Sequence, residues 1–349
     1  MATPSLALEK DESLVAIASA LAGTPVEKVA PIRRGGNSRV FRVESARGSF
    51  ALKIYPPQAA GQHDRLKSEE AALGFLRDIG LRNVPRLIAA DRDRNAALLE
   101  WVDGTFTENI SPTDIDAALA FLARLHERRT AAGATACMPA SEACLAPADA
   151  ERHVASRFSR LTEVAPEYPA LAEFLRDDLA PAFEKFLPAA RAAFAAKGIA
   201  WAAETPPRVR TLSPSDFGFH NSLRRPDGSV VFLDFEYFGW DDPAKLVCDT
   251  VFHPGMNLSI ELKLRFVVGA KALFGNDPAF AARLDALYPL FGLRWCAILL
   301  NEFLPEKWAL RAGAGEPDAD AARTRQLAKA QALFRQLLDD DPIRHAFRT

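Results

Sequence analysis

Hydrophobic and polar positions follow two different periods along this chain, and the change falls near residue 104. Before it, short runs such as "RVFRVES" and "GSFALKIY" alternate apolar and polar residues, which is the period of half-buried strands. The stretch "SLVAIASALA" instead has helical spacing, and we expect Ser13 as its N-cap and Gly23 as its end. Residues 1–103 therefore predict an α+β lobe with an antiparallel sheet.

Within this first lobe the pattern alternates helix, hairpin, helix and hairpin. The first hairpin joins "PIRRGGNSRVFRVES" to "GSFALKIYPP" through the turn "ARG", and the second joins "VPRLIAAD" to "AALLEWVDG". The helix "HDRLKSEEAALGFLRDIG" lies between them and ends at Gly80. In "FALKIY", strand alternation places Ala51 and Lys53 together on the face opposite to Leu52.

Residues 104–349 predict a second lobe that is mainly α-helical. Ser111 is the expected N-cap of one helix, and Ala-rich amphipathic stretches follow near residues 151–197. A strand–loop–strand unit at residues 208–236 interrupts these helices. The helices after residue 258 carry few reactive side chains, so we interpret them mainly as scaffold.

The composition is that of a folded globular protein, with 49% hydrophobic and 25% charged residues. A net charge of -2 argues against a broad nucleic-acid surface, and no apolar run approaches the length of a membrane span. The start "MATPSLALEKDESL" does not read as a signal peptide, and four scattered cysteines indicate reduced thiols. We therefore expect a cytoplasmic protein without nucleic-acid or membrane partners.

Three features of the first lobe could bind phosphate groups. The stretch "GGNS", with Gly35, Gly36 and Ser38, lets backbone amides approach phosphate oxygens, although a plain turn has the same composition. Lys53 either faces solvent or holds the α- and β-phosphates of a nucleotide, with the small Ala51 leaving room for the base. A glutamate of "SEEAAL" could pair with this lysine, or both could be solvated.

The second lobe contributes a separate group of polar residues in "LSPSDFGFHNSLRRPDGSVVFLDFEYFGWDDP". Asp216 and Asn221 are five residues apart, which is the interval between the base and the metal-binding Asn of a kinase catalytic loop. Asp234 follows an apolar strand, where its carboxylate can meet a cation. Carboxylate and amide oxygens suit Mg²⁺, although each acid alone could also be a cap or a buried hydrogen-bonding group.

The order of these features resembles the aminoglycoside phosphotransferase and choline kinase family, which has a bilobal protein-kinase-like fold. "GGNSRVFRV", "ALKIY", "PSDFGFHN" and "FLDFE" are similar to the family's glycine loop, lysine strand, catalytic loop and metal-binding segment. Within the resemblance, the spacing of "EEAALGFL" to its leucines favours Glu69 over Glu70 as the partner of the lysine. The resemblance also implies Glu100 and Val102 of "LLEWVDG" as the hinge that meets adenine. It also implies Asp216 as the catalytic base, with Asn221 and Asp234 as the Mg²⁺ ligands.

The chain departs from the family pattern in its catalytic loop and in the segment that follows. Pro214 stands where the family has a loop histidine, and His220 before the metal Asn is unusual; we expect His220 to pack rather than to touch substrate. In "DDPAKLVCD" the interval between Asp242 and Asp249 is longer than in the common DPxxD form. Asp249 could nevertheless brace the catalytic loop.

The resulting expectation is a Mg²⁺-dependent phosphotransferase that moves the γ-phosphate of ATP to a hydroxyl group of a small molecule. GTP stays possible as the nucleotide, and the acceptor could be a sugar, an amino alcohol or an aminoglycoside-like molecule. Asp241, Asp242 and Glu236 could supply the acidic cleft that a polycation requires. The alternative is a catalytically silent nucleotide-binding regulatory protein; a protein-serine kinase fits less well, because no APE-type segment follows Asp234.

Overall fold

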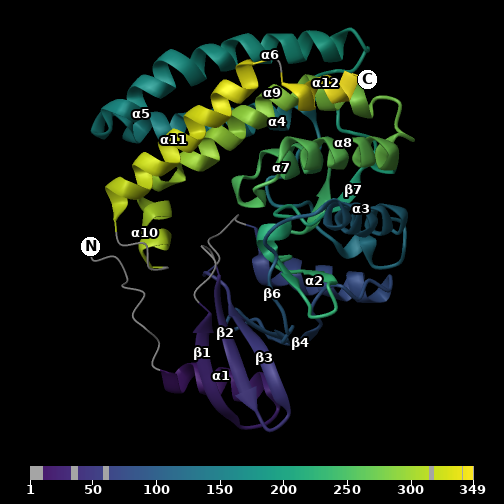
Figure 1. The fold of residues 1–349 in the computed structure, drawn as a ribbon, viewed down its shortest axis with the longest axis vertical. Helices are drawn as coiled ribbons and strands as arrows, with labels where there is room; N and C mark the ends of the chain where they lie inside the picture. Colours follow the sequence, from purple (N-terminus) through teal and green to yellow (C-terminus); the bar gives the residue numbers. More distant parts are fainter. Residues whose placement is uncertain (1–10, 33–37, 58–62, 314–317, 340, 349) are drawn as a thin grey trace.

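The computed structural model describes residues 11–32, 38–57, 63–313, 318–339 and 341–348. They form an N-terminal part built on a sheet and a C-terminal part built mainly of helices, as Figure 1 shows. The predicted α+β, protein-kinase-like fold with an antiparallel sheet in its first lobe is therefore confirmed. The exact boundary between residues 103 and 104 stays a prediction.

The sheet of the N-terminal part has five strands in the order β1-β2-β3-β5-β4, each antiparallel to its neighbours. The strands are β1 Val26–Ile32, β2 Arg39–Ser45, β3 Gly48–Ile54, β4 Leu87–Asp91 and β5 Ala96–Glu100. The two predicted hairpins, β2–β3 and β4–β5, are confirmed. The prediction was wrong for β1, which is a separate strand beginning at Val26. Only Val26 of this strand is buried, so its sequence shows no clear alternation.

Two helices accompany this sheet, α1 Asp11–Ala22 and α2 Arg65–Asp78. Ser13 is not the N-cap of α1, because the helix already begins at Asp11. Gly23 does follow the helix end, with a left-handed φ of 61°. Asp64 caps α2 by accepting a hydrogen bond from the backbone N–H of Lys67.

The apolar side chains form two cores of unequal size. The smaller core joins α1 to β1, β2, β3 and β5. The larger core fills the C-terminal part and extends into α2 through Leu66, Leu73 and Leu76. The helix that carries Glu69 is therefore packed against the second lobe, which fixes this glutamate relative to the polar residues of that lobe.

The C-terminal part consists mainly of ten helices in the described residues. They are α3 Pro112–Glu127, α4 Pro147–Val164, α5 Pro169–Phe174, α6 Ala180–Ala195, α7 Pro243–Phe252, α8 Ile260–Phe274, α9 Phe280–Leu299, α10 Pro305–Gly313, α11 Ala319–Leu338 and α12 Pro342–Arg348. Ser111 caps α3 in a capping box with Asp114, as predicted. The long helix α9 packs against α4, α7 and α11, and it is the central helix of the larger core.

Short strands hold the loops that carry the second group of polar residues. They are β6 Thr105–Phe106, β7 Thr211–Ser213, β8 Ser222–Arg224, β9 Val230–Phe232 and β10 Gly239–Asp241. They pair antiparallel as β6-β8-β9 and as β7-β10. Residues 214–221 therefore connect β7 to β8, and residues 233–238 connect β9 to β10, so the two loops begin and end on paired strands.

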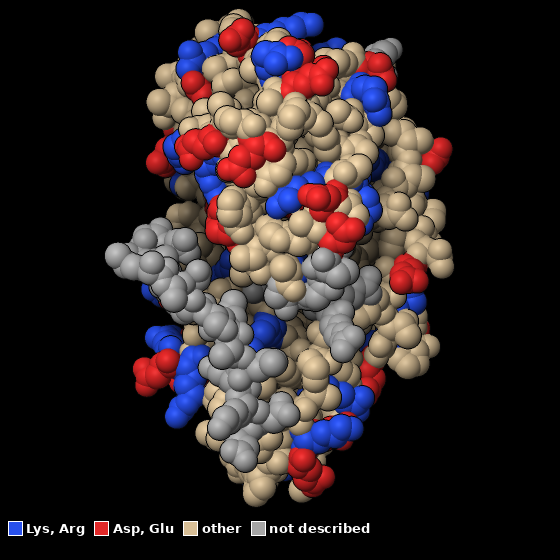
Figure 2. Space-filling model, turned by 90° about the vertical axis from the view of Figure 1, so that its left-hand side faces the viewer, with Lys and Arg blue, Asp and Glu red and all other residues tan. Residues whose placement is uncertain are grey.

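The face of the molecule drawn in Figure 2 shows no broad field of one charge among the described residues. Figure 2 shows acidic and basic side chains interspersed over one face of the molecule, as a net charge of -2 leads us to expect. Among the described residues, no helix combines the length and apolar character needed to span a membrane. All four cysteines are buried free thiols, in agreement with the sequence.

Candidate active site

Lys53 is the centre of an ion-paired cluster between the two lobes. Its Nζ lies 2.6 Å from Glu69 Oε2, 2.6 Å from Asp234 Oδ1 and 3.2 Å from Glu236 Oε2. The lysine is only 4% exposed, so the solvent-facing alternative is excluded. Burial alone would lower its pKa, but Asp234 and Glu69 hold the pKa of Lys53 well above its ordinary value.

Glu69 is the glutamate that the helix presents to this lysine. Its Oε2 also accepts a hydrogen bond from the Tyr55 hydroxyl at 2.6 Å, and its Oε1 accepts one from the Phe235 backbone N–H at 3.1 Å. Glu70 instead pairs with Arg92 at the surface. Glu69 therefore links the lysine strand to the segment that follows Asp234.

Three carboxylates meet two cations in this cluster, which leaves an excess of one negative charge. Arg65, in the first turn of α2, contacts Glu236 Oε1 at 3.1 Å, and the Ser38 hydroxyl donates to Glu236 Oε2 at 2.5 Å. Asp234 is the exposed carboxylate, with 37% of its side chain accessible, whereas Glu69 and Glu236 are 1% exposed. Burial raises the pKa of Asp234, and Lys53 offsets only part of this rise because Glu69 and Asp216 add like charge.

The backbone brings Asp234 and Asn221 to the same place. The Leu233 N–H donates to the carbonyl oxygen of Asn221 at 2.8 Å, so the residue before Asp234 is tied directly to Asn221. Asp234 itself has a φ of 65°, a left-handed conformation that non-glycine residues seldom adopt. Such strain is common where a functional side chain has to be turned in one direction.

Asp216 lies in the loop between β7 and β8, and Asn221 holds it. The Nδ2 of Asn221 donates to the backbone oxygen of Asp216 at 3.0 Å and to its Oδ2 at 3.2 Å. Ser215, immediately before Asp216, has a left-handed φ of 67°. Pro214 accepts the Asp216 N–H at 2.9 Å through its carbonyl oxygen, so a tight turn precedes Asp216 where the family has its loop histidine.

Two histidines contact the other oxygen of Asp216. His220 Nε2 lies 3.1 Å and His253 Nε2 lies 3.4 Å from Asp216 Oδ1, and the two rings stack with centroids 3.8 Å apart. The expectation that His220 only packs was therefore incomplete, because the ring both stacks and reaches the carboxylate. Burial would raise the pKa of Asp216, but the hydrogen bonds from His220 and His253 hold it well below its ordinary value.

These clusters differ in their suitability for a metal ion. Asp216, His220 and His253 place their ligand atoms close together. However, His253 Nδ1 accepts the Gly255 N–H at 3.0 Å, so the neutral ring carries its proton on Nε2, where a metal would need a lone pair. The histidines are therefore hydrogen-bond donors to Asp216.

The acidic group of Glu69, Asp234 and Glu236 already surrounds the ammonium of Lys53, so its centre is not available to a metal. The exposed Asp234 remains, together with the amide oxygen of Asn221. This is a hard oxygen donor set next to an excess negative charge, and both properties fit Mg²⁺.

The remaining predicted nucleotide residues have different surroundings. Gly35 and Gly36 lie outside the described residues. Ala51 is on β3 opposite Leu99 of β5, on the same strand as Lys53, and Val102 is buried just after β5. The Glu100 N–H donates to the Arg86 carbonyl oxygen at 2.8 Å.

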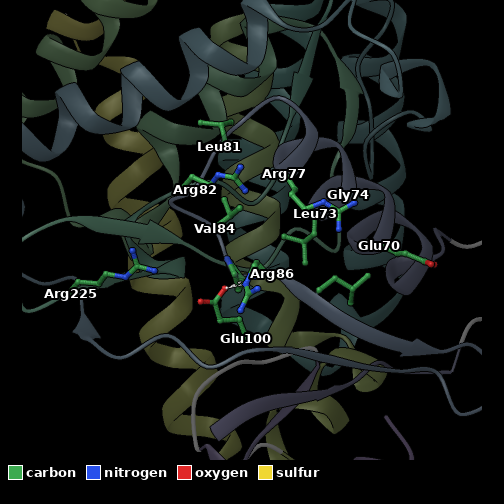
Figure 3. A pocket seen from close by; sticks show the side chains of 12 residues that line it. Glu70, Leu73, Gly74, Arg77, Leu81, Arg82, Val84, Arg86, Glu100 and Arg225 are labelled. Atoms are coloured by element: carbon green, nitrogen blue, oxygen red, sulfur yellow. Dashed lines mark hydrogen bonds and ion pairs between the residues drawn. The ribbon is translucent and has the colours of Figure 1, made fainter. Parts of the chain in front are cut away.

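The Glu100 side chain is engaged by Arg86 at the edge of a cavity. It accepts hydrogen bonds from Arg86 and lines a cavity of about 380 Å³ behind α2. Figure 3 shows this cavity, which also contains Arg77, Arg82 and Arg225. A role of Glu100 in binding adenine therefore concerns its backbone carbonyl rather than its carboxylate.

The proposed acidic cleft is not formed by Asp241 and Asp242, and this expectation was wrong. They are 0% and 2% exposed, because Lys245 pairs with Asp241 at 2.9 Å and Arg283 pairs with Asp242 at 3.0 Å. Glu236 is equally buried. None of the three carboxylates presents negative charge to an acceptor.

Asp249 braces the loop only indirectly. Its carboxylate contacts Lys245, Arg294 and the indole N–H of Trp295, and the Trp295 ring packs edge-on against His253. The helices after residue 258 are therefore more than scaffold, since α9 supplies Arg294 and Trp295.

Sequence reasoning missed His253 and Tyr55. Tyr55 is two positions after Lys53, so strand alternation directs both side chains to the same face, and this signal could have identified Tyr55. His253 lies 37 residues beyond Asp216 without a motif that marks it. Only the turn η6 Pro254–Met256, which packs on the catalytic loop through Gly255 and Met256, brings His253 to the carboxylate.

Comparisons with known proteins show which fold the chain shares and which family it matches. No curated protein sequence matches the chain significantly. A solved spectinomycin phosphotransferase, in complex with ADP and spectinomycin, is similar in fold, with a TM-score of 0.61, 13% identity and coverage of 97% of both chains. The choline kinase LicA from Streptococcus pneumoniae has a TM-score of 0.58 at 14% identity, covering 94% of this chain and 100% of its own. An ethanolamine kinase from Plasmodium vivax has a TM-score of 0.54 at 15% identity, covering 93% of this chain and 86% of its own.

The family assignment rests on the sequence profile of the phosphotransferase enzyme family. This profile matches residues 28–284, which include Lys53, Glu69 and the whole stretch from Asp216 to Asp234. The match covers well over half of the chain, and it includes both lobes. The chain is therefore a member of the phosphotransferase enzyme family.

Proposed function

We propose that this chain transfers the γ-phosphoryl group of ATP to a hydroxyl group of a small molecule with the help of Mg²⁺. The observation that carries the proposal is the meeting of two sets of residues between the lobes. Lys53, paired with Glu69, contacts Asp234 directly, and the backbone ties Asp234 to Asn221 and hence to Asp216. This is the combination of groups that phosphoryl transfer requires.

Each residue of the cluster has a separate role in this reaction. Lys53 would hold the phosphate oxygens of the nucleotide, and Glu69 would keep the ammonium in place. Asp234 and Asn221 would hold Mg²⁺, which when bound neutralises charge on the phosphates. Residues 1–103 would form the nucleotide-binding lobe, and residues 104–349 the lobe that binds the acceptor. ATP is the proposed nucleotide, with GTP as the alternative.

Asp216 would orient the acceptor hydroxyl and receive its proton. The two histidines engage Oδ1, which leaves Oδ2, next to Asn221, to face the hydroxyl. The lowered pKa makes this carboxylate a weak base in the free enzyme. A weak base suits phosphoryl transfer, because catalysis depends mainly on positioning and charge stabilisation rather than on early removal of the proton.

The acceptor is proposed to be a small molecule because the fold neighbours are named for such substrates: spectinomycin, choline and ethanolamine. A protein substrate fits less well. Only residues 235–242 separate Asp234 from α7, and this leaves no segment on which a peptide could dock.

The test is Asp216→Asn, with Asp93→Asn on an exposed turn as the matched control. We expect Asp216→Asn to lower ADP release by at least about 10²-fold with any active acceptor, while ADP affinity measured by calorimetry stays unchanged. The panel contains hydroxyl compounds and is run with ATP or GTP, and with Mg²⁺ or EDTA. Unchanged turnover in Asp216→Asn would refute the role of this residue. Nucleotide binding without turnover of any acceptor would favour the catalytically silent alternative.

A further inference from the structure

Cations from three separate helices lie near one another, and one of them contacts the Lys53 cluster. Arg65 comes from the start of α2, Arg157 and Arg160 come from α4, and Lys307 comes from α10. Arg160 contacts Glu306, which ties α4 to α10. Figure 1 shows α10 at the edge of the C-terminal part that lies nearest the N-terminal part. Arg65 also contacts Glu236 of the Lys53 cluster, which places one end of this group of cations next to the proposed site.

Lys307 differs from its neighbours because it lacks a counter-ion within the described residues. Arg65 pairs with Glu236, Arg157 with Glu142 and Arg160 with Glu306. No such ion pair forms at Lys307, although its side chain is half-buried. Burial lowers the pKa of Lys307, and the positive charges of Arg160, Arg157 and Arg65 lower it further. The charge of Glu306 opposes this shift only in part, so the cluster contains an ammonium without a direct ion-pair partner among the described residues.

Arg157 and Arg294 also retain unused hydrogen-bond donors. Glu142 accepts from Arg157 Nη2 at 2.5 Å and from Arg294 Nη2 at 2.7 Å. The Nε atoms of both arginines are buried and have no partner among the described residues, and the Arg294 side chain is only 7% exposed. An unpaired buried donor is costly, so such donors usually have a ligand or water partner.

The loop that carries Glu142 connects this cluster to the catalytic residues. The Ser141 N–H donates to the Tyr237 carbonyl oxygen at 3.1 Å, and the Ser141 carbonyl oxygen accepts from the Ser215 hydroxyl at 3.4 Å. Ser215 immediately precedes Asp216. Glu142 has a left-handed φ of 50°, so the backbone at this point is bent next to the catalytic loop.

We propose that Lys307, together with Arg157 and Arg160, forms a subsite for an anionic group, a carboxylate or a phosphate, on the acceptor. That the anion belongs to the acceptor rests on the proposed function, whereas the anion site itself follows from the charges. An anion would compensate the Lys307 ammonium and accept from a guanidinium N–H. A polycationic acceptor would instead bring further positive charge to the unpaired ammonium of Lys307.

The first experiment measures anion binding without any acceptor. Inorganic phosphate is titrated by calorimetry into the full chain saturated with ADP and Mg²⁺, so that the nucleotide site is filled. We expect wild type to bind phosphate and Lys307→Met to bind it about tenfold more weakly, which corresponds to one charge-assisted hydrogen bond. Lys307→Arg should retain binding, and Lys329→Met, on the exposed face of α11, should match wild type.

Folding of the variant is checked in the same preparations. Lys307→Met removes a repelled charge, so its free energy of unfolding without phosphate should equal or exceed that of wild type, and added phosphate should stabilise wild type more. The anion site is refuted if phosphate fails to bind wild type, or if it binds Lys307→Met equally well.

The second experiment separates this inference from the kinase proposal. Three similar hydroxylated compounds join the acceptor panel. Gluconate carries a carboxylate, sorbitol carries no charge, and glucosamine carries an ammonium. For an active acceptor, Lys307→Met should raise its KM and leave the KM for ATP unchanged. If a neutral or cationic acceptor is preferred and Lys307→Met does not alter its kcat/KM, the anion site is wrong and the kinase stands. If no acceptor is phosphorylated but phosphate binding depends on Lys307, the kinase proposal fails and the anion site stands.

Discussion

The pairing of Lys53 with Glu69 can be tested by stability alone, because the cluster is buried. Lys53→Met leaves Glu69 and Glu236, each 1% exposed, without their shared ammonium. Breaking one side of a buried ion pair costs about 3–5 kcal/mol of unfolding free energy. Glu69→Gln keeps an acceptor for only one of its two donors, Tyr55 or the Phe235 N–H, and removes a charge that Lys53 needs, so it should cost a similar amount.

The double variant distinguishes a specific pair from general damage. The wild-type cluster has one excess negative charge, Lys53→Met has two, and the double variant returns to one. The losses of unfolding free energy in the two single variants should therefore add up to about 2 kcal/mol more than the loss in the double variant. The reason is that residues in one ion-pair network are coupled. Additive losses would show that Lys53 and Glu69 do not interact.

Urea unfolding, followed by tryptophan fluorescence without nucleotide, measures these free energies. The slope of the unfolding free energy against urea concentration should be the same in all variants, so that shifts of the unfolding midpoint report stability. Glu70→Gln is the matched control, because Glu70 pairs with Arg92 at the surface, and its loss should cost less than about 0.5 kcal/mol. A loss at Glu70 as large as at Glu69 would contradict the assignment of the partner.

Two further predictions concern the frame of the site. Gly218→Ala places a Cβ against the Met256 sulfur, so it should cost about 1–3 kcal/mol of unfolding free energy and lower turnover. Its control is Gly74→Ala, in open space on α2, which should be neutral or stabilising in urea unfolding. Burial lowers the pKa of His126 to about 4, so protonation destabilises the fold as the pH falls from about 6.5 toward 4. His126→Gln should remove up to about 3 kcal/mol of the acid-induced loss measured between pH 7.5 and 4.5, and an unchanged loss would contradict this account.

The sequence by itself determined the parts of the site that depend on local spacing. Strand alternation placed Ala51 and Lys53 on one face, helical spacing favoured Glu69 over Glu70, and the five-residue interval joined Asp216 to Asn221. Each relation is set within one strand, one helix turn or one loop, where backbone geometry fixes the direction of a side chain. The structure brings these residues together, while their catalytic roles stay proposals.

Only the tertiary structure decided which charges face the cleft. Asp241 and Asp242 are an acidic pair in the sequence, but Lys245 and Arg283 bury and neutralise them. His253 reaches Asp216 because η6 folds over the catalytic loop. Lys307 gathers with arginines that lie about 150 or more residues earlier in the chain. Burial and charge depend on contacts between distant segments, and no local period encodes such contacts.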